Sequence, residues 1–377
     1  MKGILILTVL FGLAGLSHAE DIHFGATNLW KLQLGHYCQS SAALDASGVI
    51  YVTCQDGRLF AVTPDGTIRW QFKSHFESVS TPAVGADGSI FFGSRNHRVY
   101  AVTANGRQQW EFKTGGWVDA SPALGADSTV YIGSWDKKFY ALTPDGKLRW
   151  EFATGGPIVS SAAVDTAGVI YFGSHDQKFY ALNPDGSKRW EFAAGGPITS
   201  SPAIGSEGEI YFTSVNGRFY ALNPDGGRRW ELQTGGTSSS SPVIGPDGTL
   251  YVSVNQTHIA IAPDGKLKWQ RGFWNPEPGR LGESAATVLA NDTVVFTGGD
   301  GFVMTVPAGA GDKDWCWNYY LLGPGYCSPL IATNGIIYVT EPSGELHALQ
   351  RSAPIAQSPW PTFRGNVQRT GRVAAGH

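Results

Sequence analysis

Residues 160–196 read SSAAVDTAGVIYFGSHDQKFYALNPDGSKRWEFAAGG, and close copies of this stretch fill most of the chain. Its apolar and alternating segments predict four short strands, over residues 161–164, 169–173, 178–182 and 189–192. The second segment is almost wholly apolar, which is typical of a strand that neighbours cover on both faces. The fourth alternates polar and apolar residues, which is typical of a strand with one face in water.

The third and fourth predicted strands are joined by the turn Asn183-Pro184-Asp185-Gly186. Proline restricts the first dihedral angle of a tight turn, and glycine accepts the positive φ that other residues resist. The aspartate recurs at this turn in other copies of the stretch. We therefore expect its carboxylate to make local hydrogen bonds rather than to bind a metal ion, and we predict no metal ligands.

The copies follow one another at an interval that tryptophan marks. Six tryptophans lie 40 residues apart, a seventh follows after 39 residues and an eighth after 48. A period of about 40 residues with four strands in each unit is typical of a β-propeller blade. We predict that each of these indoles docks on the adjacent blade; the docking tryptophans are Trp30, Trp70, Trp110, Trp150, Trp190, Trp230, Trp269 and Trp317.

The number of repeats predicts an all-β fold, an eight-bladed β-propeller of four-stranded antiparallel blades. The eighth repeat lacks an obvious fourth strand, whereas residues 30–34 form a surplus outer strand at the other end of the chain. We predict that this N-terminal strand completes the last blade, because a closed ring leaves no open sheet edge.

The ends of the chain differ from the repeats. Residues 1–19 have a positive start, an apolar run and a small-residue pair before Glu20, which predicts a cleaved signal peptide. No other stretch is apolar over the length of a membrane span. We assign residues 20–357 to the propeller, and we expect the tail of residues 358–377 to pack on the outside of the propeller or to trail from it.

The composition narrows the classes of partner. The chain has 377 residues, of which 42% are hydrophobic and 16% charged, and its formal net charge is −3. A protein that holds nucleic acid normally carries a basic stripe, so we expect no nucleic-acid partner. We expect a monomer that is periplasmic or secreted.

Repeats of the form YxGSxDxKxYALxPDGxxxW resemble those of the PQQ-like (quinoprotein-type) eight-bladed propeller family. The tail WPTFRGNVQRTG is similar to a segment of bacterial members. The family includes quinoprotein alcohol dehydrogenases and the outer-membrane assembly factor BamB, and the resemblance therefore implies either an envelope scaffold or an enzyme. The chain looks like the BamB branch but has no cysteine directly after the apolar run to carry a lipid.

The resemblance also defines the enzymatic alternative. The dehydrogenases hold pyrroloquinoline quinone and Ca²⁺ with a pair of adjacent cysteines and with Glu, Asn and Asp, and this sequence has no adjacent cysteines. Signatures of hydrolases, metalloproteases and phosphate-binding loops are absent from the sequence as well. We therefore predict no catalytic residue and no cofactor; a quinone-dependent oxidoreductase is the alternative.

Departures from the repeat indicate where function resides. Two long insertions precede the seventh and eighth blades, and aromatic or basic residues interrupt other loops that should share their face. Such residues dominate binding hot spots. The predicted partner-binding residues are Tyr37, Phe76, Arg95, Trp117, Trp135, Phe273, Trp274, Arg280, Tyr319 and Tyr320.

Three interpretations of this face remain open. Its aromatic residues could bind a protein, bind or cleave a carbohydrate, or simply fill the channel and the junctions between blades. We favour a non-catalytic scaffold of the cell envelope whose partner is an envelope or extracellular protein, with a glycan as the other candidate.

The four cysteines also fall at departures from the repeat, and an even number in an exported chain predicts disulfides. The hairpin register places Cys38 opposite Cys54, so we predict the pairs Cys38–Cys54 and Cys316–Cys327. A bond between Cys38 and Cys327 across the closing seam is the alternative.

Overall fold

A computed structural model describes residues 27–255, 257–272, 284–290, 293–297, 302–307, 316–320, 327–350 and 356–373. At residues 302, 307 and 316–320 the backbone alone is described. The expected signal peptide lies outside these ranges. Over the described ranges no helix has the length and apolar character needed to cross a membrane.

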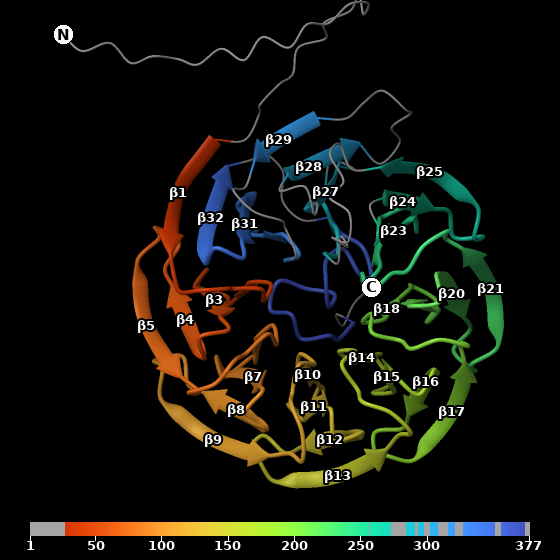
Figure 1. Cartoon of the computed structure of the whole chain (residues 1–377), viewed down its shortest axis with the longest axis horizontal. Helices are drawn as coiled ribbons and strands as arrows, with labels where there is room; N and C mark the ends of the chain where they lie inside the picture. The colour runs from red at the N-terminus through yellow and green to blue at the C-terminus, as the bar shows by residue number, and fades with distance from the viewer. Residues whose placement is uncertain are drawn as a thin grey trace, which may run out of the picture.

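Eight four-stranded antiparallel sheets are arranged radially around a centre (Figure 1). This confirms the predicted all-β, eight-bladed propeller. Blades one to four consist of β2 (Ala43–Leu44), β3 (Ile50–Thr53), β4 (Arg58–Val62) and β5 (Ile68–Lys73); β6 (Ala83–Val84), β7 (Ile90–Ser94), β8 (Arg98–Val102) and β9 (Gln108–Lys113); β10 (Ala123–Leu124), β11 (Val130–Gly133), β12 (Lys138–Leu142) and β13 (Leu148–Ala153); β14 (Ala163–Val164), β15 (Ile170–Gly173), β16 (Lys178–Leu182) and β17 (Lys188–Ala193).

The remaining blades follow the same strand order, except that the last strand of blade eight is the first strand of the chain. Blades five to eight consist of β18 (Ala203–Ile204), β19 (Ile210–Ser214), β20 (Arg218–Leu222) and β21 (Arg228–Gln233); β22 (Val243–Ile244), β23 (Leu250–Val254), β24 (Thr257–Ile261) and β25 (Leu267–Gly272); β26 (Thr287–Val288), β27 (Thr293–Thr297), β28 (Phe302–Pro307) and β29 (Cys316–Tyr320); β30 (Leu330–Ile331), β31 (Ile336–Thr340), β32 (Glu345–Gln350) and β1 (Thr27–Gln33).

Burial explains the strand sequences. The second strand of a blade is buried along its length, as in β15, because adjacent blades cover both of its faces. The outer strand alternates exposed and half-buried side chains, as in β17, because only one face packs inward. The apolar and alternating segments of each repeat therefore correspond to the inner and outer strands.

The ring is closed by β1, which pairs antiparallel with β32 in blade eight. Trp30 lies opposite Ala348, and Gln33 opposite Glu345. Beyond the strand, the Leu34 N–H donates to the Gly344 carbonyl over 2.9 Å. The predicted closure by the N-terminal strand is confirmed.

The indoles join neighbouring blades along the outside of the ring. The Trp150 Nε1–H donates over 3.0 Å to the carbonyl of Pro184, in the outer turn of the next blade. A Cβ on Gly186 would lie 2.6 Å from the Trp150 ring, and Gly186 has a φ of +86°, so this turn admits only glycine. The same bond is made by Trp30, Trp70, Trp110, Trp190 and Trp230.

Hydroxyl groups join the blades along the inside. In every blade except the sixth, the residue two positions before the inner strand donates its backbone N–H to a side-chain hydroxyl of the next blade. The sixth blade lacks this bond because the counterpart in blade seven is Ala285, which has no hydroxyl. These bonds run from Ser41 to Thr81, Thr81 to Ser121, Ser121 to Ser161, Ser161 to Ser201, Ser201 to Ser241, Ala285 to Ser328 and Ser328 to Ser41. The last bond crosses the closing seam, so the inner circuit passes through the point at which the chain ends meet.

The C-terminal tail lies at the centre of the propeller (Figure 1). Its carbonyls accept hydrogen bonds from the inner strands of blades one, two, three, four, six and seven. For example, the Leu44 N–H donates to Val367 and the Ile244 N–H to Trp360, each over 2.8 Å. The expected position on the outside is wrong, because short inner strands leave backbone donors facing the axis and the tail supplies their acceptors.

Candidate functional site

One pair of residues recurs at the same end of each of the first six blades. The residue that follows the second strand donates its backbone N–H to the carbonyl of a residue in the loop before the first strand. We call these two residues the rim pair. The rim pairs are Gln55 with Tyr37, Arg95 with Glu77, Trp135 with Trp117, His175 with Pro157, Val215 with Pro197, and Asn255 with Thr237.

The side chains of the rim pairs vary although their backbone bond is constant. Blades one to three carry aromatic or charged side chains, whereas blades five and six carry Pro197, Val215, Thr237 and Asn255. Because the backbone bond does not depend on the side chain, these positions vary without cost to the blade. The aromatic side chains therefore reflect a surface property rather than a need of the fold.

Four aromatic side chains on this end are exposed. Tyr37 is 60% exposed, Phe76 51%, Trp117 42% and Trp135 37%. Isolated large apolar residues are common on protein surfaces, but contiguous ones mark interaction sites. Together with Arg95 these residues form what we call the aromatic rim, and its continuity rests on the contacts described next.

Arg95 occupies the middle of the aromatic rim. Its Nε donates to Asp119 Oδ1 over 2.9 Å, and its Nη1 donates to Glu77 Oε2 over 2.8 Å. The guanidinium lies over the Trp117 ring, 5.1 Å from its centroid. The hydrogen bond and charge of Asp119, with those of Glu77, raise the pKa of Arg95 against the effect of burial. The cation is thus held between blades two and three.

Ring contacts extend the aromatic rim from blade three to blade four. The Trp117 and Trp135 rings meet edge to face with centroids 5.7 Å apart, and Trp135 meets His175 in the same way at 5.8 Å. The Trp135 Nε1–H donates to Asp119 Oδ2 over 2.9 Å. Burial lowers the pKa of His175, and the nearby Asp176 charge partly opposes this shift. The neutral imidazole of His175 is therefore the last ring in this series of contacts.

The backbone of Phe76 packs on blade one. It lies so close to Gly57 that a Cβ there would lie 2.7 Å from the Phe76 nitrogen and oxygen. The Phe76 carbonyl also accepts a hydrogen bond from Ser74 Oγ over 2.9 Å. These contacts hold the exposed phenyl ring at the junction of blades one and two.

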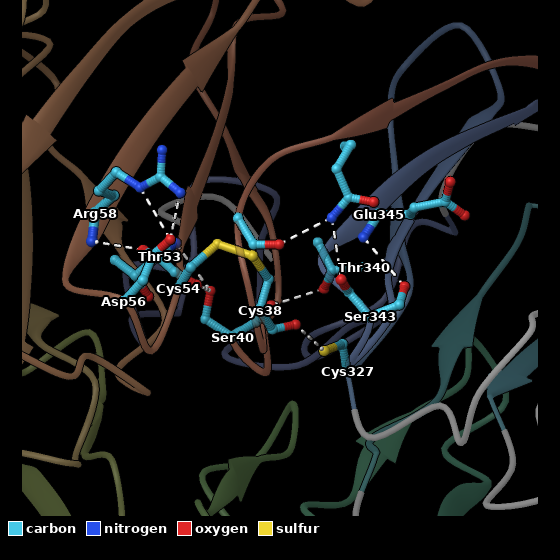
Figure 2. Close-up of a disulfide and its surroundings, with 12 residues drawn as sticks. Cys38, Ser40, Thr53, Cys54, Asp56, Arg58, Cys327, Thr340, Ser343 and Glu345 are labelled. Carbon is cyan, nitrogen blue, oxygen red and sulfur yellow. Dashed lines mark hydrogen bonds and ion pairs between the residues drawn. A yellow bond between two sulfur atoms is a disulfide. The ribbon is translucent and has the colours of Figure 1, made fainter.

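A disulfide, drawn in Figure 2, directly follows the first residue of the aromatic rim in the sequence. Cys38 is bonded to Cys54, and both are fully buried. Tyr37 precedes Cys38 and has a φ of +54°, a left-handed conformation that a bulky residue rarely adopts. Such a conformation persists only where surrounding structure enforces it. The disulfide and the Gln55–Tyr37 backbone bond supply that constraint.

The second expected disulfide, Cys316–Cys327, is not formed. Cys327 carries a free, buried thiol whose sulfur lies 3.5 Å from the Cys38 carbonyl oxygen (Figure 2). The thiol faces blade one across the closing seam, where Cys38 already has Cys54 as its partner. The alternative Cys38–Cys327 bond is therefore absent too. Burial raises the pKa of Cys327 to about 12, so the thiol is unreactive.

The structure brings together one part of the predicted partner-binding set. Contacts join Arg95, Trp117 and Trp135. Phe76 precedes Glu77, the ion-pair partner of Arg95, and Tyr37 lies on the adjoining blade-one loop. Phe273, Trp274 and Arg280 lie outside the described residues. Tyr319 and Tyr320 lie in β29, of which only the backbone is described, and they are paired with Val303 and Phe302.

Sequence reasoning missed the contact of His175 with Trp135 and the part that Asp119 plays as a shared acceptor. Both residues stand at positions that vary among the repeats. Comparing the two rim-pair positions blade by blade would have identified His175, because its counterpart in blade three is Trp135.

Comparisons with known proteins agree with this architecture. The family model for outer membrane protein assembly factor BamB matches residues 24–151, 95–200 and 175–319. The crystal structure of BamB from Moraxella catarrhalis has a TM-score of 0.72 and 16% identity, covering 86% of this chain and 98% of that one. A europium-containing methanol dehydrogenase has a TM-score of 0.72 and 14% identity, covering 92% and 87%.

No curated protein matches the chain. The two solved structures are too distant in sequence to show more than a shared propeller fold. The family matches, taken together, extend from residue 24 to residue 319, which is well over half of the sequence. The chain therefore belongs to the family of outer membrane protein assembly factor BamB.

Proposed function

We propose that this protein is an exported, non-catalytic propeller that binds a protein partner of the cell envelope through the aromatic rim. The observation that carries the proposal is the unbroken row of contacts from Arg95 through Trp117 and Trp135 to His175. Exposed aromatic rings held in place by an arginine and its carboxylates form a preorganised hot spot.

Two features favour a scaffold over a quinone-dependent enzyme, and a third favours export. The sequence lacks the adjacent cysteines of the quinone-binding relatives. The tail forms hydrogen bonds with the last residues of the inner strands, next to the turns that lead to the second strands. These turns lie at the opposite end of the blades from the rim pairs, and Trp360 and Arg369 are buried there. These buried side chains occupy the propeller axis at that end. The buried Cys38–Cys54 disulfide is in keeping with an oxidising compartment, the periplasm or the exterior.

The test is capture of the partner from the native envelope by crosslinking. The variant Trp117→Ala/Trp135→Ala should lose the captured protein while its melting temperature stays nearly unchanged, because both rings are more than one-third exposed. The control variant Leu148→Ala/Leu267→Ala removes two side chains that are each 46% exposed on outer strands, and it should still capture the partner.

Three outcomes would contradict the proposal. A large loss of stability in the tryptophan variant would show that the rings pack the blade junctions. Reduction of a dye on adding pyrroloquinoline quinone, Ca²⁺ and an alcohol or sugar would show an oxidoreductase. Binding of the wild-type protein to a glycan array, lost in the tryptophan variant, would replace the protein partner by a carbohydrate.

A further inference from the structure

Blade eight departs from the repeat at three positions that meet in space. The turn between β31 and β32 contributes Glu341, and β32 contributes Glu345 and His347. One potential ligand atom from each of these side chains lies within 4.8 Å of the other two. The cluster lies beside the seam where β1 closes the ring, because Gln33 of β1 is paired with Glu345.

The equivalent positions in other blades carry different chemistry. The register identifies the counterparts of His347 in blades one to five as aromatic residues, since His347 lies opposite Val339 as Tyr140 lies opposite Ile132. In blades six and seven the counterparts are Ile259 and Met304. The counterparts of Glu341, Glu345 and His347 in blade three are Ser134, Lys138 and Tyr140. A hydroxyl, a cation and a ring have thus been replaced together by two carboxylates and an imidazole.

The Glu341 carboxylate has an unused oxygen. Glu341 is fully buried, and its Oε1 is hydrogen bonded to His347 Nε2. Its Oε2 is also buried, and no described residue forms a hydrogen bond with it. Burying a carboxylate oxygen without a partner is costly, and buried charges are normally paired or bound to a metal ion. The unused oxygen is the second sign, besides the clustering, that this group of side chains has a ligand.

Glu345 connects the cluster to solvent and to β1. Its Oε1 lies 3.0 Å from Lys31 Nζ, whereas its Oε2 lies 3.6 Å from His347 Nε2. The hydrogen bond from Lys31 is the main reason why the pKa of Glu345 lies below its ordinary value, so the carboxylate stays ionised. The Glu345 side chain is 17% exposed and His347 is 3% exposed, which leaves entry to the cluster on the Glu345 side.

We propose that Glu341, Glu345 and His347 form a binding site for a divalent transition-metal ion that clamps the closing seam of the propeller. One imidazole nitrogen and two carboxylates suit Zn²⁺, and also Mn²⁺ or Co²⁺, better than the all-oxygen set that Ca²⁺ prefers. Two carboxylate charges neutralise a divalent cation. His347 would exchange its bond to Glu341 for the metal and present the Nε2 lone pair, and the proton shared by Nε2 and Glu341 Oε1 would be released to solvent.

A metal ion at this position would act on ring closure. It would tie Glu341 of the turn to β32, and β32 holds β1 through the pairing of Glu345 with Gln33. The Gln33 Nε2 group also donates to the Ser343 carbonyl over 3.0 Å (Figure 2). The metal would therefore stiffen the hairpin on which the last blade depends.

The test uses the purified protein, stripped of metal with a chelator and titrated with ZnSO₄. Binding at a single site should raise the melting temperature by several degrees, because a ligand that binds only the folded state stabilises it. Co²⁺ should bind with the absorption of a low-coordinate nitrogen and oxygen site. Elemental analysis should find one equivalent of Zn²⁺ in the reloaded protein.

Variants that restore the repeat separate metal binding from folding. Glu341→Ser and His347→Tyr introduce residues that blade three already accommodates, so they should fold but lose both the zinc-dependent shift and the Co²⁺ absorption. Glu345→Arg, at the partly exposed position, should do the same. The control variant Glu151→Gln, which removes a carboxylate from the Lys138 ion pair on blade three, should bind zinc as the wild type does.

Two results would overturn the proposal. One is a melting temperature that none of Zn²⁺, Mn²⁺ and Co²⁺ raises. The other is a zinc-dependent shift of equal size in the wild type, Glu341→Ser and His347→Tyr, which would mean that the ion binds elsewhere on the chain.

Discussion

Asp119 accepts hydrogen bonds from two members of the aromatic rim, one of which is Arg95. Its Oδ1 receives the Arg95 Nε–H over 2.9 Å, and its Oδ2 receives the indole N–H of Trp135, also over 2.9 Å. A single carboxylate on blade three thus orients a cation from blade two and a ring from its own blade. Preorganisation of this kind lowers the entropy lost when a partner binds.

We predict that Asp119→Ala weakens partner binding about tenfold, which corresponds to about 1.4 kcal/mol, because Arg95 and Trp135 lose their common acceptor. The Asp119 side chain is only 12% exposed, so the melting temperature should fall by a few degrees while the fold is retained. Titration calorimetry with the purified partner, once crosslinking has identified it, measures the affinity. Glu77→Gln, which removes only the outer partner of Arg95, should have a smaller effect; equal affinities for the wild type and Asp119→Ala would contradict this arrangement.

The disulfide should stabilise the fold measurably. We expect Cys38→Ser/Cys54→Ser to lower the free energy of unfolding by about 2–4 kcal/mol, since the bond restricts the unfolded chain. Denaturant titration measures this change, with Cys327→Ala, which removes a free thiol, as the control. Peptide mapping of a non-reduced digest should recover the Cys38–Cys54 link. Recovering Cys38 linked to Cys327 instead would disprove the assignment.

His258 should make the protein sensitive to acid. It is fully buried, stacks on Phe296 at 4.1 Å between centroids, and burial lowers its pKa from 6.5 to about 3. Below pH 6.5 the His258 imidazole binds a proton in the unfolded chain but stays neutral in the folded protein. The free energy of unfolding therefore decreases as the pH falls from 6.5 towards 3.

The variant His258→Phe isolates this effect, because phenylalanine stands at the equivalent position of blade three, Phe139. Its stability should fall less steeply than that of the wild type between pH 6.5 and pH 4. Urea titrations across this range provide the measurement. Parallel curves for the two proteins would show that His258 is not the titrating group.

Two arginines of the tail should respond in opposite ways to the same substitution. Arg369 donates to the carbonyls of Ala42, Phe363 and Pro329 and to Thr362 Oγ1. Arg364 is as deeply buried, yet among the described residues its three guanidinium nitrogens have no hydrogen-bond partner. Burial lowers the pKa of both, that of Arg369 to about 9.

We predict that Arg369→Met costs about 2–4 kcal/mol of stability, since it strands several buried carbonyls. Arg364→Met should be neutral or stabilising, because it removes an uncompensated buried charge. Thermal and denaturant unfolding of the two variants give the comparison. Equal losses would mean that Arg364 has a counter-charge.

Sequence periodicity was sufficient to predict the blades and their closure. Each copy carries its own turn residues and docking tryptophan, so the local signals agree with one another, as those of residues 160–196 do. Closure followed from a strand surplus at residues 30–34 and a deficit in blade eight. These features depend on patterns shared by many residues.

Single positions were harder to predict. The tail has no period of its own, and backbone carbonyls hold it in place, so residues 358–373 gave no sign of lying at the centre. The sequence did not predict the cluster of Glu341, Glu345 and His347, because each of these residues, taken alone, resembles an ordinary surface substitution. Only the register, which places the three together, identifies it.

The pairing of Trp30 with Ala348 has a consequence for biosynthesis. A ribosome makes β1 first, and that strand must wait for nearly the whole message to be translated before its partner β32 exists. Until then the ring has two unsatisfied edges. A chain truncated shortly before β32 would therefore keep an open ring with exposed strand edges, and such edges promote aggregation.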